Sequence, residues 1–101
     1  MMMDEVVSAA RKKVLFLPHA IAQMSRPERM IEPDEIREAV LTGEVIESYP
    51  DDPRGMSCLV LHIGEHRAIH VVCAPRPDFL AIITAYLPAP EQWTSDFRVR
   101  I

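Results

Sequence analysis

The chain has 101 residues, 49% of them hydrophobic and 26% charged, which is the composition of one ordinary globular domain. The length excludes barrels and doubly wound nucleotide-binding folds, and the composition excludes disordered, collagen-like and coiled-coil chains. Eleven lysines and arginines against fifteen aspartates and glutamates give a formal charge of −4. A protein that grips nucleic acid over its whole surface is therefore excluded, and any contact with phosphate must be local.

Two helices are predicted near the N-terminus. Asp4 is suited to cap a helix that runs through Lys13, because its carboxylate accepts hydrogen bonds from free amide groups and the last turn is basic. Pro18 suits the first turn of a second helix over about residues 19–25. Pro27 ends this helix, because proline lacks an amide hydrogen and its ring clashes with the preceding turn.

A third helix is predicted to begin near Pro33 and to end at Gly43, which is expected to be a left-handed C-cap. After Gly43 the pattern of apolar residues becomes that of strands separated by turn-forming clusters. The predicted strands cover residues 44–49, 57–63, 68–74 and 79–87. Four-residue loops join the last three strands, so these form an antiparallel meander.

The predicted fold class is therefore α+β, with a single domain over residues 1–101. About three N-terminal helices (about 4–42) pack on a four-stranded antiparallel sheet (about 44–87), and a tail (88–101) follows. In the tail apolar residues alternate with arginines, so we expect either an added edge strand or an arm that binds a partner. These apolar residues are Phe97, Val99 and Ile101. Because the strands are apolar on both faces, a partner or a homodimer is expected to cover one of them.

Three histidines, His62, His66 and His70, have the spacing of metal ligands on one face of a helix. The surrounding pattern instead predicts a β-hairpin with His66 in its loop, so the rings do not converge, and no metal or other cofactor is expected. The same hairpin places Cys58 directly opposite Cys73. A cross-strand disulfide fits this geometry, but two reduced, buried side chains are favoured in a cytosolic chain.

His70 is the first candidate catalytic residue, because it interrupts an otherwise apolar strand. A buried ring must be hydrogen-bonded, or it costs on the order of 1–3 kcal/mol. It is either a structural residue bonded to Thr84 or Tyr86 on the next strand, or a general acid or base tuned by its surroundings. Tyr86 is the second candidate for proton transfer, or else a tyrosine with a buried ring and a solvated hydroxyl.

Three more candidates carry charge or a second imidazole. His19 opens the second helix, where it is available as a base or an electrophile, or is a packing residue. Arg29 lies in the polar turn after that helix, and Arg54 follows the turn after the first predicted strand. We expect these side chains either to form a small basic patch for a phosphate or to be separate, solvated residues.

Short motifs in a fixed order carry a family resemblance. They are His19-Ala20, Met24, Arg29, Glu35–Val40, Gly43–Glu47, Tyr49–Asp52, Arg54-Gly55, Ser57–Leu61, His70–Val72, Thr84–Tyr86, Pro88 and Trp93. This ordered set resembles the bacterial family known as domain of unknown function 4258, over roughly residues 5–93. The family has an arginine four residues after the first histidine, where this chain has Gln23.

That family is similar in element order to the RelE/ParE-like toxins, small cytoplasmic α+β proteins with helices on a curved antiparallel sheet. The resemblance implies a toxin that cleaves messenger RNA, free or on the ribosome, and that has a small antitoxin protein as partner. Cleavage without a metal needs a base, an acid and a cation beside the phosphate. His70, Tyr86 and His19 are then the candidates for proton transfer, and Arg54 or Arg29 for the cation.

The alternative hypothesis is a non-catalytic protein-binding or regulatory module of the same fold. The acidic charge, Gln23 and the small number of aromatic residues that could stack on bases favour it. A basic patch around Arg54 and His19 is the feature that favours the nuclease instead. The N-terminus is acidic and the longest apolar stretch has nine residues, over 79–87, so no signal peptide or membrane helix is expected and the protein is predicted to be cytoplasmic.

Overall fold

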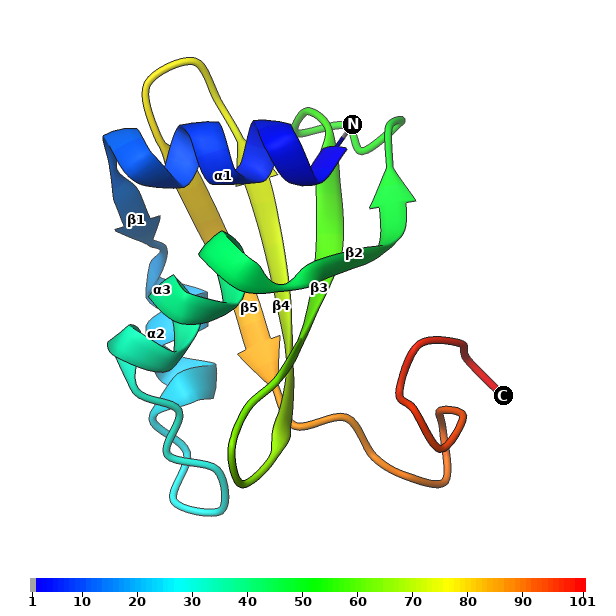
Figure 1. Cartoon of the computed structure of the whole chain (residues 1–101). Coiled ribbons are helices and arrows are strands. Elements are labelled where there is room, and N and C mark those ends of the chain that lie inside the picture. Colours follow the sequence, from blue (N-terminus) through cyan, green and yellow to red (C-terminus); the bar gives the residue numbers. More distant parts are fainter. Residues whose placement is uncertain (1) are drawn as a thin grey trace.

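A computed structural model describes residues 2–101 and contains helices and one mixed sheet (Figure 1). The helices are α1 (Met2–Lys12), α2 (Pro18–Met24) and α3 (Pro33–Thr42). The strands are β1 (Val14–Phe16), β2 (Glu44–Tyr49), β3 (Ser57–Ile63), β4 (Ala68–Pro75) and β5 (Leu80–Tyr86). Their order in the sheet is β1-β5-β4-β3-β2. The α+β class is confirmed.

The prediction of four strands is wrong, because β1 adds a fifth strand to the sheet. It pairs with β5 in parallel, with Val14 opposite Leu80. The amide of Leu80 donates to the carbonyl of Lys13 at 2.8 Å, and the amide of Leu17 donates to Ile82 at 3.1 Å. A strand of three residues between two helices is too short to show a period of two, so its pattern is hidden in the sequence.

Two predicted helix ends also differ. Asp4 is not the N-cap of α1 but lies in its first turn, where its charge still complements the helix dipole. Gly43 ends α3 with φ −80° and ψ −163°, which is not the left-handed region. Glycine is required there for space, since a Cβ would lie 2.5 Å from the carbonyl oxygen of Ala39 and 2.7 Å from that of Leu61. Gly43 therefore lets the chain turn directly from α3 into β2 while it lies close to the backbone of β3.

The two faces of the sheet are covered by different parts of the chain. On one face the helices bury an apolar core, to which all three contribute. Its members include Val6, Ala20, Ile36, Val40, Val60, Ile69, Val71 and Ile82. Because side chains alternate along a strand, His70 of β4 points to the opposite face, which we call the far face.

The tail covers part of the far face (orange to red in Figure 1). Its Trp93 is 3% exposed, and a single bridge joins Trp93 to Arg100. The tail is therefore not an added edge strand, and that prediction is wrong: the segment folds back on itself and lies across the sheet instead of extending along its edge. A role as a partner-binding arm stays a prediction.

The β3–β4 hairpin has the predicted register. Cys58 lies opposite Cys73, and His66 is in the loop between the strands. The two sulfur atoms are 3.9 Å apart and both cysteines are free and buried. A disulfide requires about 2.0 Å, so the pair is reduced, as the favoured interpretation predicted.

Candidate functional site

His70 is the centre of a buried polar cluster on the far face. Its ring is fully buried, with Nδ1 3.2 Å from the hydroxyl of Tyr86 and Nε2 2.9 Å from the carbonyl oxygen of Phe97. A carbonyl only accepts, so Nε2 carries the hydrogen, and Nδ1 accepts from the Tyr86 hydroxyl. Burial lowers the pKa of His70 and favours the neutral ring, although the bond to Phe97 opposes this shift.

Aromatic rings enclose the imidazole on two sides. The Tyr86 ring centroid is 5.3 Å away, and the Trp93 centroid is 4.4 Å away with an interplanar angle of 85°. Burial raises the pKa of Tyr86, so its hydroxyl keeps its proton. The structure thus brings two of the predicted proton-transfer groups together and excludes water from the imidazole.

An ionic group that no sequence pattern indicated lies beside these residues. Arg100 of the tail donates to Glu47 of β2 at 2.9 Å, and Tyr49 donates to the same carboxylate. The Arg100 guanidinium also lies 4.6 Å from the centroid of the Trp93 ring. Partial burial raises the pKa of Glu47, but the bonds from Arg100 and Tyr49 outweigh it and lower the pKa overall. Burial and the bond to Glu47 raise the pKa of Tyr49 to about 12.

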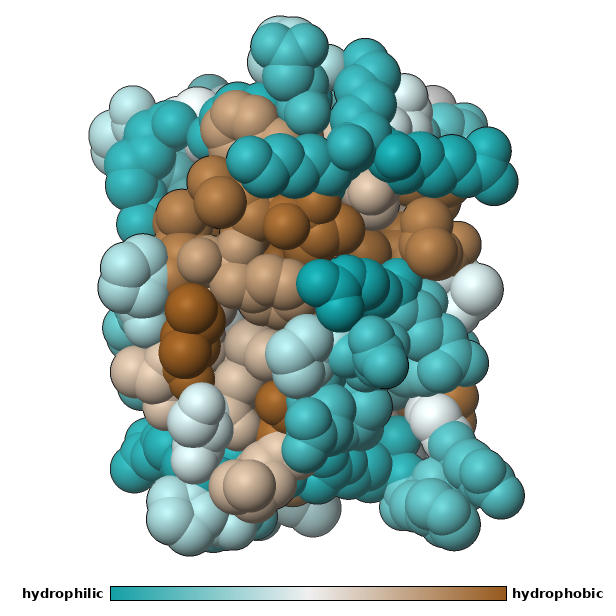
Figure 2. Space-filling model, turned by 90° about the vertical axis from the view of Figure 1, so that its left-hand side faces the viewer, coloured by the Kyte–Doolittle hydropathy of each residue, from teal (hydrophilic) through white to brown (hydrophobic). Residues whose placement is uncertain are grey.

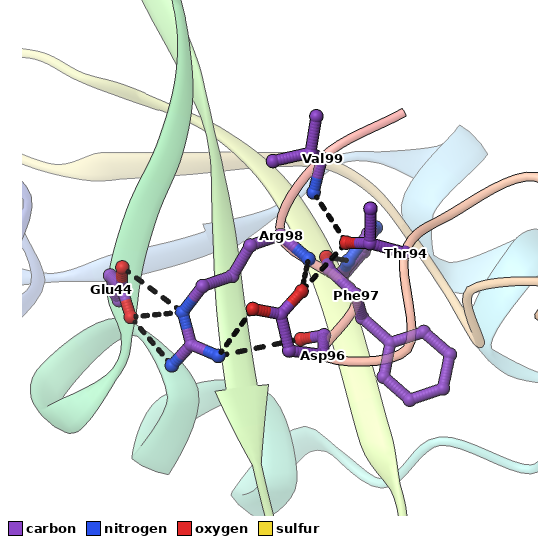
Figure 3. A network of polar contacts seen from close by, with 7 residues as sticks. Glu44, Thr94, Asp96, Phe97, Arg98 and Val99 are labelled. Carbon is purple, nitrogen blue, oxygen red and sulfur yellow. Dashed lines mark hydrogen bonds and ion pairs between the residues drawn. The ribbon is translucent and has the colours of Figure 1, made fainter. Parts of the chain in front are cut away.

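A second tail contact, drawn in Figure 3, lies along the same strand. Arg98 donates to Glu44 at 3.0 Å and also pairs with Asp96. Thr94 donates to Asp96 at 2.6 Å and accepts from the amide of Val99, which closes the turn. Within this turn Phe97 has φ +61°, an unfavourable value for a side chain of its size. The side-chain hydrogen bonds of this turn fix the position of the Phe97 carbonyl, which accepts the hydrogen bond from His70.

The two glutamates face the tail together because β2 contains a bulge. Glu44 lies opposite Leu61 and Glu47 opposite Leu59, with a register shift between Val45 and Glu47. In a regular strand, residues three apart would point to opposite faces. The bulge places both carboxylates on the far face, and no spacing rule in the sequence reveals it.

Within residues 2–101, the remaining predicted site residues form no hydrogen bond with the side chain of His70 or Tyr86. Arg29 donates to the carbonyl of Ala85 at 3.3 Å, one residue before Tyr86. Arg54 pairs with Asp52 at 3.3 Å near the start of β3, at the opposite end of the sheet, and its amide and side chain lower the pKa of Asp52 to about 2. His19 is exposed at the start of α2.

Within residues 2–101 no hydrogen bond or ion pair joins Arg54 or His19 to the His70 cluster. The part of the chain that the structure describes also contains no group of three or more histidine, cysteine or acidic side chains arranged to hold a metal.

The other notable surface surrounds the outer edge of β1, and we call it the β1 surface. Leu15 is 37% exposed and Ile21 is 52% exposed. A cavity of about 280 Å³ on the far face is lined by Leu15, Leu17, Asp52, Arg54, Ala74, Arg76, Phe79, Ala81 and Ile83. A second cavity, of about 330 Å³, is lined by Phe16, Ile21, Met24, Ser25, Met30, Ile31, Glu32 and Pro33. Figure 2 views this edge and shows hydrophobic surface across its middle, with hydrophilic residues above and below.

Fold and site together define a small α+β domain with helices on one face of its sheet and a closed histidine–tyrosine cluster on the other. The chain belongs to the family described as Domain of unknown function (DUF4258), which matches residues 16–87. The match includes His70 and Tyr86 but neither α1 nor the tail. No curated protein and no solved structure matches the chain. None of the helices described is long and apolar enough to cross a membrane.

Proposed function

We propose that the chain is a non-catalytic protein-binding module whose docking site is the β1 surface. One observation carries this proposal: apolar side chains remain uncovered on both sides of an open sheet edge. Leu15 borders one cavity, and Ile21 and Phe16 border the other. Exposed apolar surface of this kind, rimmed by polar residues, is typical of protein-interaction sites.

The state of the His70 cluster supports a non-catalytic role. Both ring nitrogens are hydrogen-bonded within the fold, and the ring is fully buried. A general base must reach the proton that it removes, directly or through one water. Neither ring nitrogen of His70 is free to do so while the tail is in place. Two arginines are occupied as well, Arg29 by the carbonyl of Ala85 and Arg100 by Glu47.

Selection from an unbiased displayed-peptide library tests the proposal. The wild-type chain is the bait, and each recovered peptide is then measured against Leu15→Asp, Ile21→Asp and a control, Ile63→Asp. Ile63 is 57% exposed but lines neither cavity. We expect peptides whose affinity falls at least about tenfold with the first two variants and is unchanged with the control. Recovery of no such peptide overturns the proposal.

A metal-independent endoribonuclease of the RelE/ParE-like toxin kind, with a small antitoxin as partner, is the second candidate. The bond between His70 and Tyr86 favours it, because it pairs two of the predicted proton-transfer groups. Arg29 is bonded to the backbone of the residue before Tyr86. His19 and Arg54 would have to act from outside this cluster. The nuclease requires the tail to leave the far face so that RNA reaches His70. A cytoplasmic location suits both candidates and the two reduced cysteines.

Tight induction in bacteria tests the nuclease. Growth is compared for the wild type, His70→Ala and Tyr86→Phe at equal soluble abundance, with RNA cleavage followed in extracts. Growth arrest with RNA cleavage by the wild type alone supports the nuclease. Arrest by all three chains without cleavage supports inhibition by binding. If no chain arrests growth, the nuclease is overturned.

A further inference from the structure

The outer side of β1 presents free backbone groups in a regular pattern. Lys13 and Leu17 direct their backbone toward β5, since Lys13 accepts from Leu80 and Leu17 donates to Ile82. Alternate residues of a strand direct these groups to the same side, so Leu15 also faces β5. Val14 and Phe16 therefore direct their amide and carbonyl groups outward. Because β1 is an edge of the sheet, no further strand in residues 2–101 pairs with them.

The two cavities of the β1 surface lie on opposite faces of this edge. Leu15 and Leu17 line the cavity on the far face, whereas Phe16 lines the cavity on the helix side. A strand added beside β1 would direct alternate side chains to these same two faces. Each set of side chains would find an apolar cavity, of about 280 and 330 Å³. The β1 surface thus offers one apolar cavity to the side chains on each face of an incoming strand.

The charged residues around the far-face cavity indicate which charge a partner should carry. Lys13 precedes β1 in phase with Leu15, and Arg54 and Arg76 line the cavity. Among the described residues of that lining, Asp52 is the only acidic one, and it pairs with Arg54. The Arg76 guanidinium donates only to backbone carbonyls, at 2.9 to 3.1 Å. The lining of this cavity, with two arginines and one aspartate, is therefore net positive in a chain of net charge −4.

We infer that β1 accepts an extended segment of a partner protein, which adds a sixth strand to the sheet. The segment carries apolar residues on both of its faces where it lies between the two cavities, and an acidic residue at the end beside Lys13. A second copy of the chain fits less well, because it would bring the same basic rim to the interface. This inference rests on the proposed function and names the partner of its site.

Synthetic peptides and amide exchange test the inference on the whole chain. The first peptide has nine residues, with a central run of four valines, serines on either side and two glutamates at one end. The second has the same composition in a scrambled order that separates the valines, and the third replaces both glutamates by lysine. Dissociation constants are measured for all three peptides, and hydrogen exchange is followed at the amides of Val14 and Phe16 by NMR.

We expect the first peptide to slow exchange at Val14 and Phe16, and to bind at least about tenfold more tightly than the scrambled peptide. The lysine peptide binds more weakly than the first, and high salt reduces the difference. Leu15→Asp removes binding, and Ile63→Asp retains it. Equal binding of the scrambled peptide, or protection away from β1, overturns the inference.

Two results separate this inference from the proposed function. One result is a set of library peptides whose binding requires Leu15 but does not slow exchange at the amides of Val14 and Phe16. Such a result contradicts strand addition and agrees with the proposed protein-binding module. A peptide-free protein that sediments as a dimer with both amides protected assigns the edge to a second copy and also contradicts the inference. Absence of any peptide that depends on the β1 surface contradicts both.

Discussion

At the β2 side of the sheet the chain covers its own surface, whereas at the β1 side it leaves the surface open. The tail places Trp93 over His70 and pairs Arg98 and Arg100 with two glutamates of β2. On β1, no segment of residues 2–101 covers Leu15 and its neighbouring cavities in this way. An apolar sheet face must be packed against something to be stable in water. One half of the far face is packed by the chain itself, and the other half is the part that the proposed partner would cover.

The largest expected effect is the loss of the tryptophan that closes the β2 side. Trp93→Ala removes a buried aromatic ring that packs on His70, so the free energy of unfolding should fall by about 3–5 kcal/mol. Urea unfolding followed by far-ultraviolet circular dichroism measures this change. Ile101→Ala is the control, since Ile101 is 81% exposed, and it should change stability by less than about 0.5 kcal/mol. Equal effects of the two substitutions would mean that the tail does not stabilise the fold.

The second prediction concerns pH and the same closed cluster. Burial lowers the pKa of His70 in the folded state below the ordinary value of 6.5. The unfolded chain therefore takes up a proton first as pH falls, so stability is complete above pH 6.5 and decreases below it until the folded pKa is reached. Each pH unit in this window removes at most about 1.4 kcal/mol.

Comparison of the wild type with His70→Phe isolates this effect. The variant should lose less stability between pH 7 and pH 5 than the wild type, although it is less stable at pH 7 because Phe97 and Tyr86 lose their partner. The measurement is the free energy of unfolding at several pH values. Parallel curves for the two chains would contradict the neutral buried imidazole.

The third prediction concerns the exposed ion pair of the tail. Arg100→Ala and Glu47→Gln, combined in a double-mutant cycle, should give a coupling of less than about 1 kcal/mol, because Arg100 is largely solvated. The single tryptophan of the chain, Trp93, reports whether the tail remains packed, since its fluorescence shifts to the red on exposure to water. A coupling well above this value would make the ion pair, and not the ring packing, the main cause of closure.

Some features of the fold and the site could be predicted from the sequence, and others could not. The register of Cys58 with Cys73 follows from strand periods and loop length, which are local properties. His70 lies opposite Tyr86 only because the register of β4 with β5 shifts between Val72 and Cys73. The bond of Arg100 to Glu47 joins residues 53 positions apart and depends on a bulge in β2. Nothing local indicates either feature.

The β1 strand was hidden for a different reason. Val14–Phe16 has three residues, and its conformation is fixed by hydrogen bonds to β5 and not by its own pattern. Local rules also mispredict Gly43, because a glycine after a helix commonly adopts the left-handed conformation. Here glycine is required because a Cβ would clash with the carbonyl oxygens of Ala39 and Leu61. Tertiary contacts therefore decided the features that local rules missed.

The smallest effect on stability is expected for a substitution on the open β1 side, and it tests the difference from the closed β2 side most directly. Leu15→Ser should lower the free energy of unfolding by less than about 1 kcal/mol, because Leu15 is 37% exposed and the edge strand has one neighbour. The same substitution should weaken a strand-forming peptide severalfold, since it removes an apolar wall of the far-face cavity. Thermal unfolding and peptide titration measure the two effects on one sample. A residue that matters to binding and hardly to folding is what a docking surface requires, whereas a loss of several kcal/mol would place Leu15 in the core and leave the β1 side as closed as the other.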